Sequence, residues 1–365
     1  MEYFESIVVA AIPNFDFSDS NLPFSKAGIE SIDLITLRVA FENHIHTTIP
    51  DEIWLNFETV TDIIDYCRQN NSKYNNPQKL LFPNHLEKDI TINMPQMAIE
   101  GLSENWLFKE LGSMHWELLC HGLMTKSYDL KDELGNRLYA TFVRISIDSN
   151  ASLNTFKENE HLTINASINR FGNSLYYSTS EIKAERAMIR AKMMTSFSIR
   201  NENNNNNLSK SQPSEKRNLM EALPENPSFG NEYRALKKRE LAALNTTFGT
   251  FKITDKVIFE YNYTINPYYD LNGVGLLYFA SYPIINNIGE AAYGNQTDER
   301  WEENYFTLAR DIFYFANCNI HEEIVYKLHD IEYLADNTIK TNSSLYRKSD
   351  AVLMAKIFTL KRKKS

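Results

Sequence analysis

The chain has 365 residues, of which 43% are hydrophobic and 23% are charged, an ordinary globular composition with enough length for two or three domains. Its three cysteines (Cys67, Cys120 and Cys318) are too few and too far apart for a disulfide framework or a zinc site. The N-terminal apolar run, Ile7 to Ile12, is too short for a signal peptide or a membrane span. We therefore expect a soluble, cytoplasmic protein with no membrane partner.

The net charge is concentrated at the N-terminus. Residues 1–70 contain twelve acidic and three basic residues, a net charge of −9, which equals the net charge of the whole chain. The remaining residues are therefore neutral as a group. This distribution predicts a small acidic domain that docks on basic partners, and it argues against nucleic acid as a partner.

Helical patterns fill this acidic segment. A first helix is predicted over residues 1–12 and ends before Pro13. A second helix is predicted from Gly28 onward, and a last helix from Thr59, where Asp62 completes a variant capping box. The second helix has apolar residues at Ile32, Ile35 and Val39, widened by Leu34, Leu37 and Phe41. The last has one apolar face at Val60, Ile63, Ile64 and Cys67. We expect a bundle of three or four short helices.

The segment Gly28-Ile29-Glu30-Ser31-Ile32 resembles the core motif of acyl and peptidyl carrier proteins, with Glu in place of Asp and Ile in place of Leu. The resemblance covers residues 1–70 and implies that Ser31 carries 4'-phosphopantetheine, attached by a phosphopantetheinyl transferase. A serine at a helix N-terminus is exposed, and the positive end of the helix dipole favours the phosphodiester. The same position also suits a serine that only caps the helix.

A polar linker is predicted over residues 71–84, and the rest of the chain shows one pattern twice. In residues 85–198 a strand (89–94) precedes a helix (103–119) and several strands (137–147, 161–170 and from 175). In residues 231–365 a strand (250–265) precedes a helix that starts at Val274 and bends near Pro283, followed by strands (309–315, 324–331 and from 344). Gly101-Leu102 matches Gly273-Val274, and Ser174-Leu175-Tyr176 matches Ser344-Leu345-Tyr346 at nearly the same offset. These matches indicate an internal duplication.

A strand, one long apolar helix and several antiparallel strands are typical of a hot-dog fold, in which the sheet wraps the helix. The predicted fold class is therefore α+β: a small all-α carrier bundle followed by a double hot dog. Residues 199–230, with the run Asn203 to Asn207, are interpreted as a disordered connector and not as a site.

The segment Asp270-Leu271-Asn272-Gly273 resembles the Asp-x-Asn-Gly turn of hot-dog thioesterases, where backbone amides at a helix start hold the thioester oxygen. The histidine that usually follows the glycine is replaced by Val274. A tight glycine turn with Asp270 as a cap is the alternative. The amides near Gly101 and Gly273, aided by Asn272, are the candidate donors that would stabilise an enolate.

The first repeat is more distinctive. The segments 93–97, 101–112 and 115–116, with 270–282 and 310–315, resemble the double-hot-dog acyltransferase/decarboxylase of leinamycin-type polyketide biosynthesis. That resemblance implies transfer of an acyl group from methylmalonyl-CoA to a carrier, with decarboxylation and an acyl-O-tyrosine intermediate. Strand order makes Tyr139 the candidate for that tyrosine. The alternative is that Tyr139 only packs on a strand. His115 is interpreted as a hydrogen-bonded core histidine.

The sequence thus predicts an enzyme that transfers acyl groups from acyl-CoA onto phosphopantetheine, with polyketide or peptide synthase components or other carrier proteins as partners. A thioesterase, with Asp270 activating water, and a non-catalytic docking module for an acyl carrier remain alternatives. A double-hot-dog dehydratase ranks behind them, because neither repeat has the His-x3-Gly-x4-Pro signature.

Overall fold

The computed structural model describes residues 3–13, 15–45, 49–70, 84–99, 101–172, 174–201, 204–214 and 219–364. The chain divides into two compact units, Met1–Leu81 and Phe82–Ser365. Except for Asn84, the predicted linker over 71–84 lies outside the described residues.

The first unit is the expected helix bundle. Its helices are α1 (Tyr3–Ala11), α2 (Ser31–Ile45), α3 (Asp51–Trp54) and α4 (Val60–Asn70), with a 3-10 turn η1 (Phe17–Asp19). The predicted capping box is confirmed: Thr59 Oγ1 accepts from the amide of Asp62 at 3.1 Å, and Asp62 Oδ2 accepts from the amide of Thr59 at 2.8 Å. The predicted face of α4 is buried in a core formed by Phe4, Ile7, Val8, Ile29, Leu37, Phe41, Ile49, Val60, Ile63, Ile64 and Cys67.

The apolar stripe predicted for α2 is wrong at Ile32, Ile35 and Val39 and confirmed at Leu37 and Phe41, which were predicted to widen it. Ile32, Ile35 and Val39 are 64%, 60% and 52% exposed, whereas Leu37 and Phe41 are fully buried. Apolar residues occupy two faces of this helix, so the sequence pattern cannot choose between them. Packing against α1 selects the face of Leu37 and Phe41.

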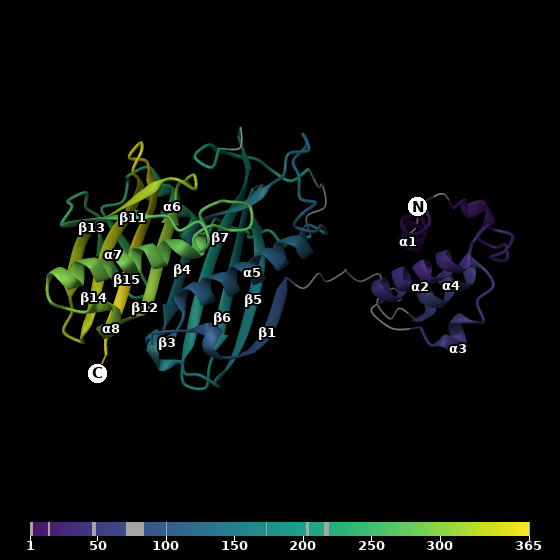
Figure 1. Ribbon diagram of the computed structural model, residues 1–365, viewed down its shortest axis with the longest axis horizontal. Coiled ribbons are helices and arrows are strands. Elements are labelled where there is room, and N and C mark those ends of the chain that lie inside the picture. Colours follow the sequence, from purple (N-terminus) through teal and green to yellow (C-terminus); the bar gives the residue numbers. More distant parts are fainter. Residues whose placement is uncertain are drawn as a thin grey trace. The chain divides into compact units, whose positions relative to one another are not determined.

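The second unit is built on one large antiparallel sheet with strand order β1-β5-β6-β7-β4-β12-β15-β14-β13-β11, to which β8 adds beside β7. Helices α5 (Glu104–Gly122) and α7 (Tyr282–Gln296) cross the same face of this sheet (Figure 1). The strands are β1 (His85–Thr91), β4 (Tyr139–Ser149), β5 (His161–Phe171), β6 (Leu175–Lys183), β7 (Met188–Arg200), β8 (Leu208–Lys210), β11 (Phe259–Thr264), β12 (Tyr305–Tyr314), β13 (Glu323–Tyr333), β14 (Thr338–Arg347) and β15 (Leu353–Lys363). Two small hairpins, β2 (Met97–Ala98) with β3 (Gly101–Leu102) and β9 (Ala243–Thr246) with β10 (Gly249–Lys252), complete the strands. The short helices are η2 (Met94–Gln96), η3 (Leu153–Thr155), α6 (Ser228–Lys237), η4 (Phe279–Ser281) and α8 (Trp301–Asn304).

The strand order is equivalent when followed from either edge of the sheet, and this repeat confirms the predicted α+β double hot dog. The order β1-β5-β6-β7-β4 with α5 matches the order β11-β13-β14-β15-β12 with α7, and β4 pairs with β12 in the middle. The local sequence matches do not superpose, however. Leu175 begins β6, whereas Leu345 lies near the end of the equivalent strand β14. The element order repeats, but those short matches do not align equivalent positions.

Two sequence-based expectations for this unit are wrong. The helix expected from Val274 begins only at Tyr282, and Pro283 lies in its first turn, where its missing amide hydrogen costs nothing. The described residues of the expected disordered connector, 199–230, contain the end of β7, strand β8 and the start of α6. Residues 202–203 and 215–218 of that connector lie outside the described residues.

Among the described residues, no helix is both long enough and apolar enough to cross a membrane.

Candidate active site at the junction of the two halves

The two central strands of the sheet separate at one end. β4 and β12 pair from Asp148↔Ala309 to Arg144↔Phe313, and the β4–β7 pairing shifts register between Phe142 and Arg144. Such a bulge bends a strand away from its neighbour. Beyond the last pair lies a cavity of about 290 Å³, lined by residues 140–143 on one side and 314–317 on the other.

Four other segments complete the cavity wall. They are the end of β7, the region around β8, helix α6, and the segment that leads into α7. Their lining residues are Ser196, Ser198, Asn205, Asn206, Leu208, Lys210, Tyr233, Lys237, Asn272, Leu276, Leu277, Tyr278, Phe279 and Tyr282. Both halves of the double hot dog and the segment between them therefore contribute to one cavity.

Three tyrosine hydroxyls of the lining donate hydrogen bonds to backbone carbonyls. Tyr233 donates to Tyr314 O at 3.1 Å, Tyr314 donates to Phe279 O at 3.1 Å, and Tyr282 donates to Ala316 O at 2.9 Å. Burial raises the pKa of Tyr233 to about 12 and raises the pKa values of Tyr282 and Tyr314 well above their ordinary value. These side chains are neutral donors at physiological pH and hold the segments of the wall together.

The lining combines polar and apolar side chains, and its only charges among the described residues are positive. Thr141 Oγ1 and Ser198 Oγ are 2.7 Å apart, and the lining contains two lysines, Lys210 and Lys237. No aspartate, glutamate, histidine or cysteine is found among the described lining residues. The cavity therefore suits a ligand that carries an anionic group together with an apolar part.

The asparagine run interpreted as disordered is instead fixed to this site in its described part. Asn205 Nδ2 donates to Gly275 O at 2.5 Å, and the amide of Asn205 donates to Asn319 Oδ1 at 3.0 Å. In return, Asn206 Oδ1 accepts from the amide of Asn319 at 3.0 Å. Low complexity misled the sequence interpretation, because asparagine amides can satisfy loop backbone groups across the fold. An amphipathic pattern in 228–237 was the available signal for α6.

The Asp270–Asn272 turn forms, but it does not begin a helix. Asn272 Oδ1 accepts from the amides of Val274 and Leu276 at 3.1 and 3.0 Å, and Gly275, with φ of +77°, supplies the left-handed position. Gly273 is exposed and has a negative or extended φ, so its lack of a side chain is not required there. Of the predicted residues in this turn, Asn272 alone lines the cavity.

Asp270 is fully buried beside the cavity rather than in its wall. Its Oδ2 accepts from Tyr263 Oη and from the amide of Asn266, both at 2.8 Å. Burial, together with this hydrogen bond, raises the pKa of Tyr263. Oδ1 of Asp270 is buried without a hydrogen-bond partner among the described residues. The carboxylate of Asp270 thus holds Asn266 beside Tyr263 of β11.

Gly101 is not among the described residues that line this cavity, and its predicted role in holding the thioester oxygen stays a prediction. It lies in β3, where a side chain would overlap the backbone of Leu153 and Asn154. Close packing of two backbones is therefore the reason for glycine at this position.

Tyr139 is the residue before the lining segment of β4 and is not itself part of the described lining. The guanidinium carbons of Arg137 and Arg200 lie 5.6 and 5.3 Å from its ring centroid. Arg200 Nη2 also donates to Val274 O at 2.6 Å, which connects Tyr139 to the Asn272 turn. The sequence did not show which groups surround Tyr139, and these cation–π contacts identify two of them.

His115 has the structural role that the sequence predicted. Its ring nitrogens lie 2.6 Å from Ser178 Oγ and 2.8 Å from Thr195 Oγ1, and burial lowers its pKa to about 3. It is a neutral core residue.

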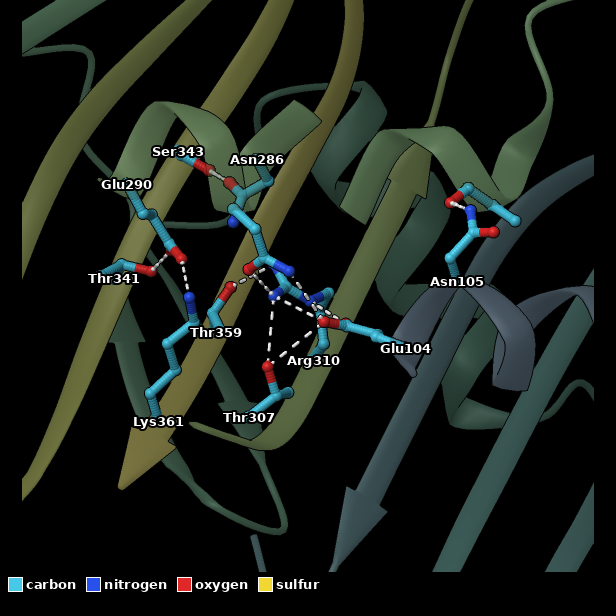
Figure 2. A network of polar contacts seen from close by, with 12 residues as sticks. Glu104, Asn105, Asn286, Glu290, Thr307, Arg310, Thr341, Ser343, Thr359 and Lys361 are labelled. Atoms are coloured by element: carbon cyan, nitrogen blue, oxygen red, sulfur yellow. Dashed lines mark hydrogen bonds and ion pairs between the residues drawn. The ribbon is translucent and has the colours of Figure 1, made fainter. Parts of the chain in front are cut away.

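A second polar cluster fills the space between the start of α5 and α7 (Figure 2). Fully buried Arg310 of β12 forms an ion pair with Glu104, and it donates to Asn287 Oδ1 at 2.7 Å and to Thr359 Oγ1 at 3.0 Å. Further along α7, Lys361 Nζ lies 2.6 Å from Glu290 Oε2. Glu104 is the first residue of α5, as Tyr282 is the first residue of α7. The start of α5 therefore contributes to this ion-pair cluster, whereas the start of α7 contributes to the wall of the cavity.

In the first unit, Ser31 is the first residue of α2 and is exposed. The residue before the helix is Glu30, whose amide donates to Asp33 Oδ2 at 2.9 Å. Gly28, with φ of +72°, forms the turn ahead of it. The serine therefore lies within the first helical turn and faces solvent.

Comparison with known proteins gives a family match for the first unit and a fold for the second. Residues 9–67 match the family model of the phosphopantetheine attachment site. The first unit is accordingly a carrier domain with an attachment site for 4'-phosphopantetheine. No curated protein matches the sequence.

The second unit has the fold of acyl thioesterases. A structure described as that of an oleoyl thioesterase from Lactobacillus plantarum is 11% identical with a TM-score of 0.54, covering 76% of this chain and 95% of that chain. A 12:0-ACP thioesterase from Umbellularia californica is 12% identical with a TM-score of 0.51, covering 78% of this chain and 96% of that chain. Identity this low establishes the fold alone.

Proposed function

We propose that the protein transfers a short acyl group from a coenzyme A thioester, such as methylmalonyl-CoA, to a phosphopantetheine thiol attached to Ser31, and decarboxylates the group when it is of the malonyl type. The observation that carries this proposal is the cavity at the junction of the two halves, in a chain that also contains a phosphopantetheine attachment site. Its volume of about 290 Å³ is at the lower end for ligand pockets, which favours a small acyl group.

The proposed reaction has two acyl-transfer steps, first to a tyrosine of the protein and then to the sulfur of the arm. In each step the attacking oxygen or sulfur forms a bond to the carbonyl carbon, the bond from that carbon to the group it came from breaks, and the departing sulfur or oxygen leaves with the electron pair and is protonated. The oxygen carries negative charge in between and needs fixed donors. The O–H and N–H groups of Ser196, Ser198 and Asn272 are lining groups of this kind. In decarboxylation the bond between the α-carbon and the carboxylate breaks, CO2 leaves, and the enolate, held by the same donors, takes a proton from water at the α-carbon.

Tyr139 is proposed as the acyl acceptor that precedes the carrier. Its pairing with the lining residue Ser198 of β7 places it on the side of that residue and supports this role, as do the two guanidinium groups against its ring. In this step the phenol oxygen takes the acyl group, coenzyme A leaves with the phenol proton, and the arm's thiol then removes the acyl group from the tyrosine. Tyr139→Phe is expected to abolish the adduct and most of the transfer. Tyr128→Phe is a matched control, because Tyr128 also contacts Arg137 but is 72% exposed.

Intact-protein mass spectrometry tests the proposal. The full chain and its Ser31→Ala variant are treated with a broad phosphopantetheinyl transferase and then with methylmalonyl-, malonyl- or propionyl-CoA. We expect an arm only on the wild type, and a propionyl adduct from methylmalonyl-CoA. An arm with no acyl gain contradicts the transferase, and no arm on Ser31 contradicts the assignment of that serine.

A thioesterase is the second candidate, favoured by the fold and by the Asp270–Asn272 turn. It would release the acyl group of a carrier as free acid, with water as the acceptor. Steady release of free acid from a pre-loaded chain, lost in Asp270→Asn while Ser31 remains acylated, would support it. Saturable binding of an acyl carrier without any change in the thioester would instead support a docking module.

A further inference from the structure

Two lysines of the cavity have no acidic partner. Lys210 ends β8 and Lys237 ends α6, both are exposed, and both line the cavity. Neither forms an ion pair with any described residue, and the described lining residues include no acid. Some other exposed lysines of this unit do have a carboxylate partner, for example Lys348 with Glu323 at 2.6 Å.

Strand register brings further positive charge to the same place. Lys210 pairs with Ser198, and Ser198 pairs with Tyr139, so these three side chains form a row across β8, β7 and β4. Arg200 lies two residues further along β7 and therefore on the same side. Its Nε is buried without a hydrogen-bond partner among the described residues. The mouth of the cavity is thus positive, and the segment between the two halves supplies its lysines.

We propose that Lys210 and Lys237 bind the phosphate groups of the thioester's pantetheine end, an inference that rests on the proposed function. Because both lysines are exposed, they contact the part of a ligand that stays at the opening, while the acyl group enters the cavity. In an acyl-pantetheine ligand, that outer part is the phosphodiester of the carrier arm or the diphosphate of coenzyme A. Lysine binds phosphate as a point charge.

Calorimetric binding of uncleavable thioethers to the full-length apo chain tests this assignment. The probes are S-propyl-CoA, S-propyl-4'-phosphopantetheine, S-propyl-pantetheine and S-carboxymethyl-pantetheine. We expect the first two to bind more tightly than S-propyl-pantetheine. Lys210→Met and Lys237→Met should each weaken them about threefold to fivefold, the range for exposed ion pairs, and leave S-propyl-pantetheine unchanged.

Controls separate the outcomes. Lys192→Met, at an exposed lysine of β7 outside the cavity, should change nothing, and Lys237→Arg should retain the affinity. A lysine effect confined to S-propyl-CoA would assign the contact to the nucleotide phosphates, and one shared with S-propyl-4'-phosphopantetheine would assign it to the phosphate of the arm. Equal binding of all probes would overturn the inference and leave the proposed function standing. A lysine effect on S-carboxymethyl-pantetheine would overturn it in favour of carboxylate recognition. No binding of any probe would overturn the proposed function as well.

Discussion

Arg144 of β4 and Phe313 of β12 form the last pair of residues before the two central strands separate. The guanidinium of Arg144 lies 4.2 Å from the Phe313 ring centroid and 4.1 Å from that of Phe229, and it also bonds to Asp311 and Glu232. Phe229 and Glu232 belong to α6, which carries Tyr233 and Lys237 of the cavity. Arg144, which lies where β4 and β12 separate, therefore also holds α6 in place beside the cavity.

Arg144→Met is expected to destabilise the second unit by about 3–5 kcal/mol, because Asp311 is then left buried without its cation. Denaturant unfolding followed by tryptophan fluorescence measures this loss. Adding Asp311→Leu should recover much of it, while Arg190→Met, at an exposed position of β7, should cost little. A double variant no more stable than Arg144→Met would contradict the explanation.

Glu290→Gln is expected to lower the free energy of unfolding by about 3–5 kcal/mol at neutral pH, because Lys361 loses its buried partner. Burial alone would raise the pKa of Glu290, but Lys361 and Arg310 outweigh it and lower the pKa. A carboxylate with a lowered folded-state pKa stabilises above its unfolded pKa, and the contribution is lost as the pH falls through the folded value. The difference between wild type and variant should therefore shrink below about pH 4. A constant difference down to pH 2 would count against this role.

His115→Gln is expected to flatten the acid dependence of stability. Because burial lowers the pKa of His115 to about 3, the unfolded chain binds a proton between pH 6.5 and 3 that the folded chain does not bind. Stability is therefore complete above pH 6.5 and falls as the pH decreases, by roughly 4 kcal/mol at pH 3 from this residue. Unfolding curves at several pH values test this. Parallel pH profiles for wild type and variant would show that His115 does not titrate in this way.

Gly112→Ala is expected to displace Phe279, a residue of the cavity wall. A methyl group at this position of α5 would overlap Cζ of Phe279, which lines the cavity and lies 4.1 Å from the Phe142 ring centroid. Overpacking of this kind costs about 1–3 kcal/mol and should weaken the binding of S-propyl-CoA. Ser113→Ala, at the exposed neighbouring position, is the control. Unchanged binding in Gly112→Ala would mean that Phe279 moves without affecting the ligand.

Ile35→Lys is expected to lower the rate of phosphopantetheine attachment about tenfold, with a change in stability below about 0.5 kcal/mol. Ile32, Ile35 and Val39 expose an apolar face on α2 next to Ser31, where a partner enzyme must approach. Leu55→Lys places the same charge at an 81% exposed apolar position elsewhere in the unit. Equal rates for the two variants would show that the α2 face does not contribute to recognition.

The parts of this protein that depend on local pattern could be predicted from the sequence. The capping box at Thr59 and Asp62, the buried face of α4 and the long helix α5 follow from residues within one or two turns of each other. The alternation of helix and strand segments likewise identified the two halves. Where two local readings were equally apolar, as on α2, sequence alone had no basis for a choice.

The cavity depended on tertiary structure, because it lies where β4 and β12 part and where the segment between the halves returns to cover the gap. The bonds that fix this arrangement join Arg144 to Asp311 and Asn205 to Asn319, residues more than a hundred positions apart in the chain. A run of asparagines has the composition of a flexible linker. Only the fold shows that its amides bind carbonyl and amide groups of distant segments. The sequence therefore determined most of the helices and strands, and only their packing decided where a ligand can enter.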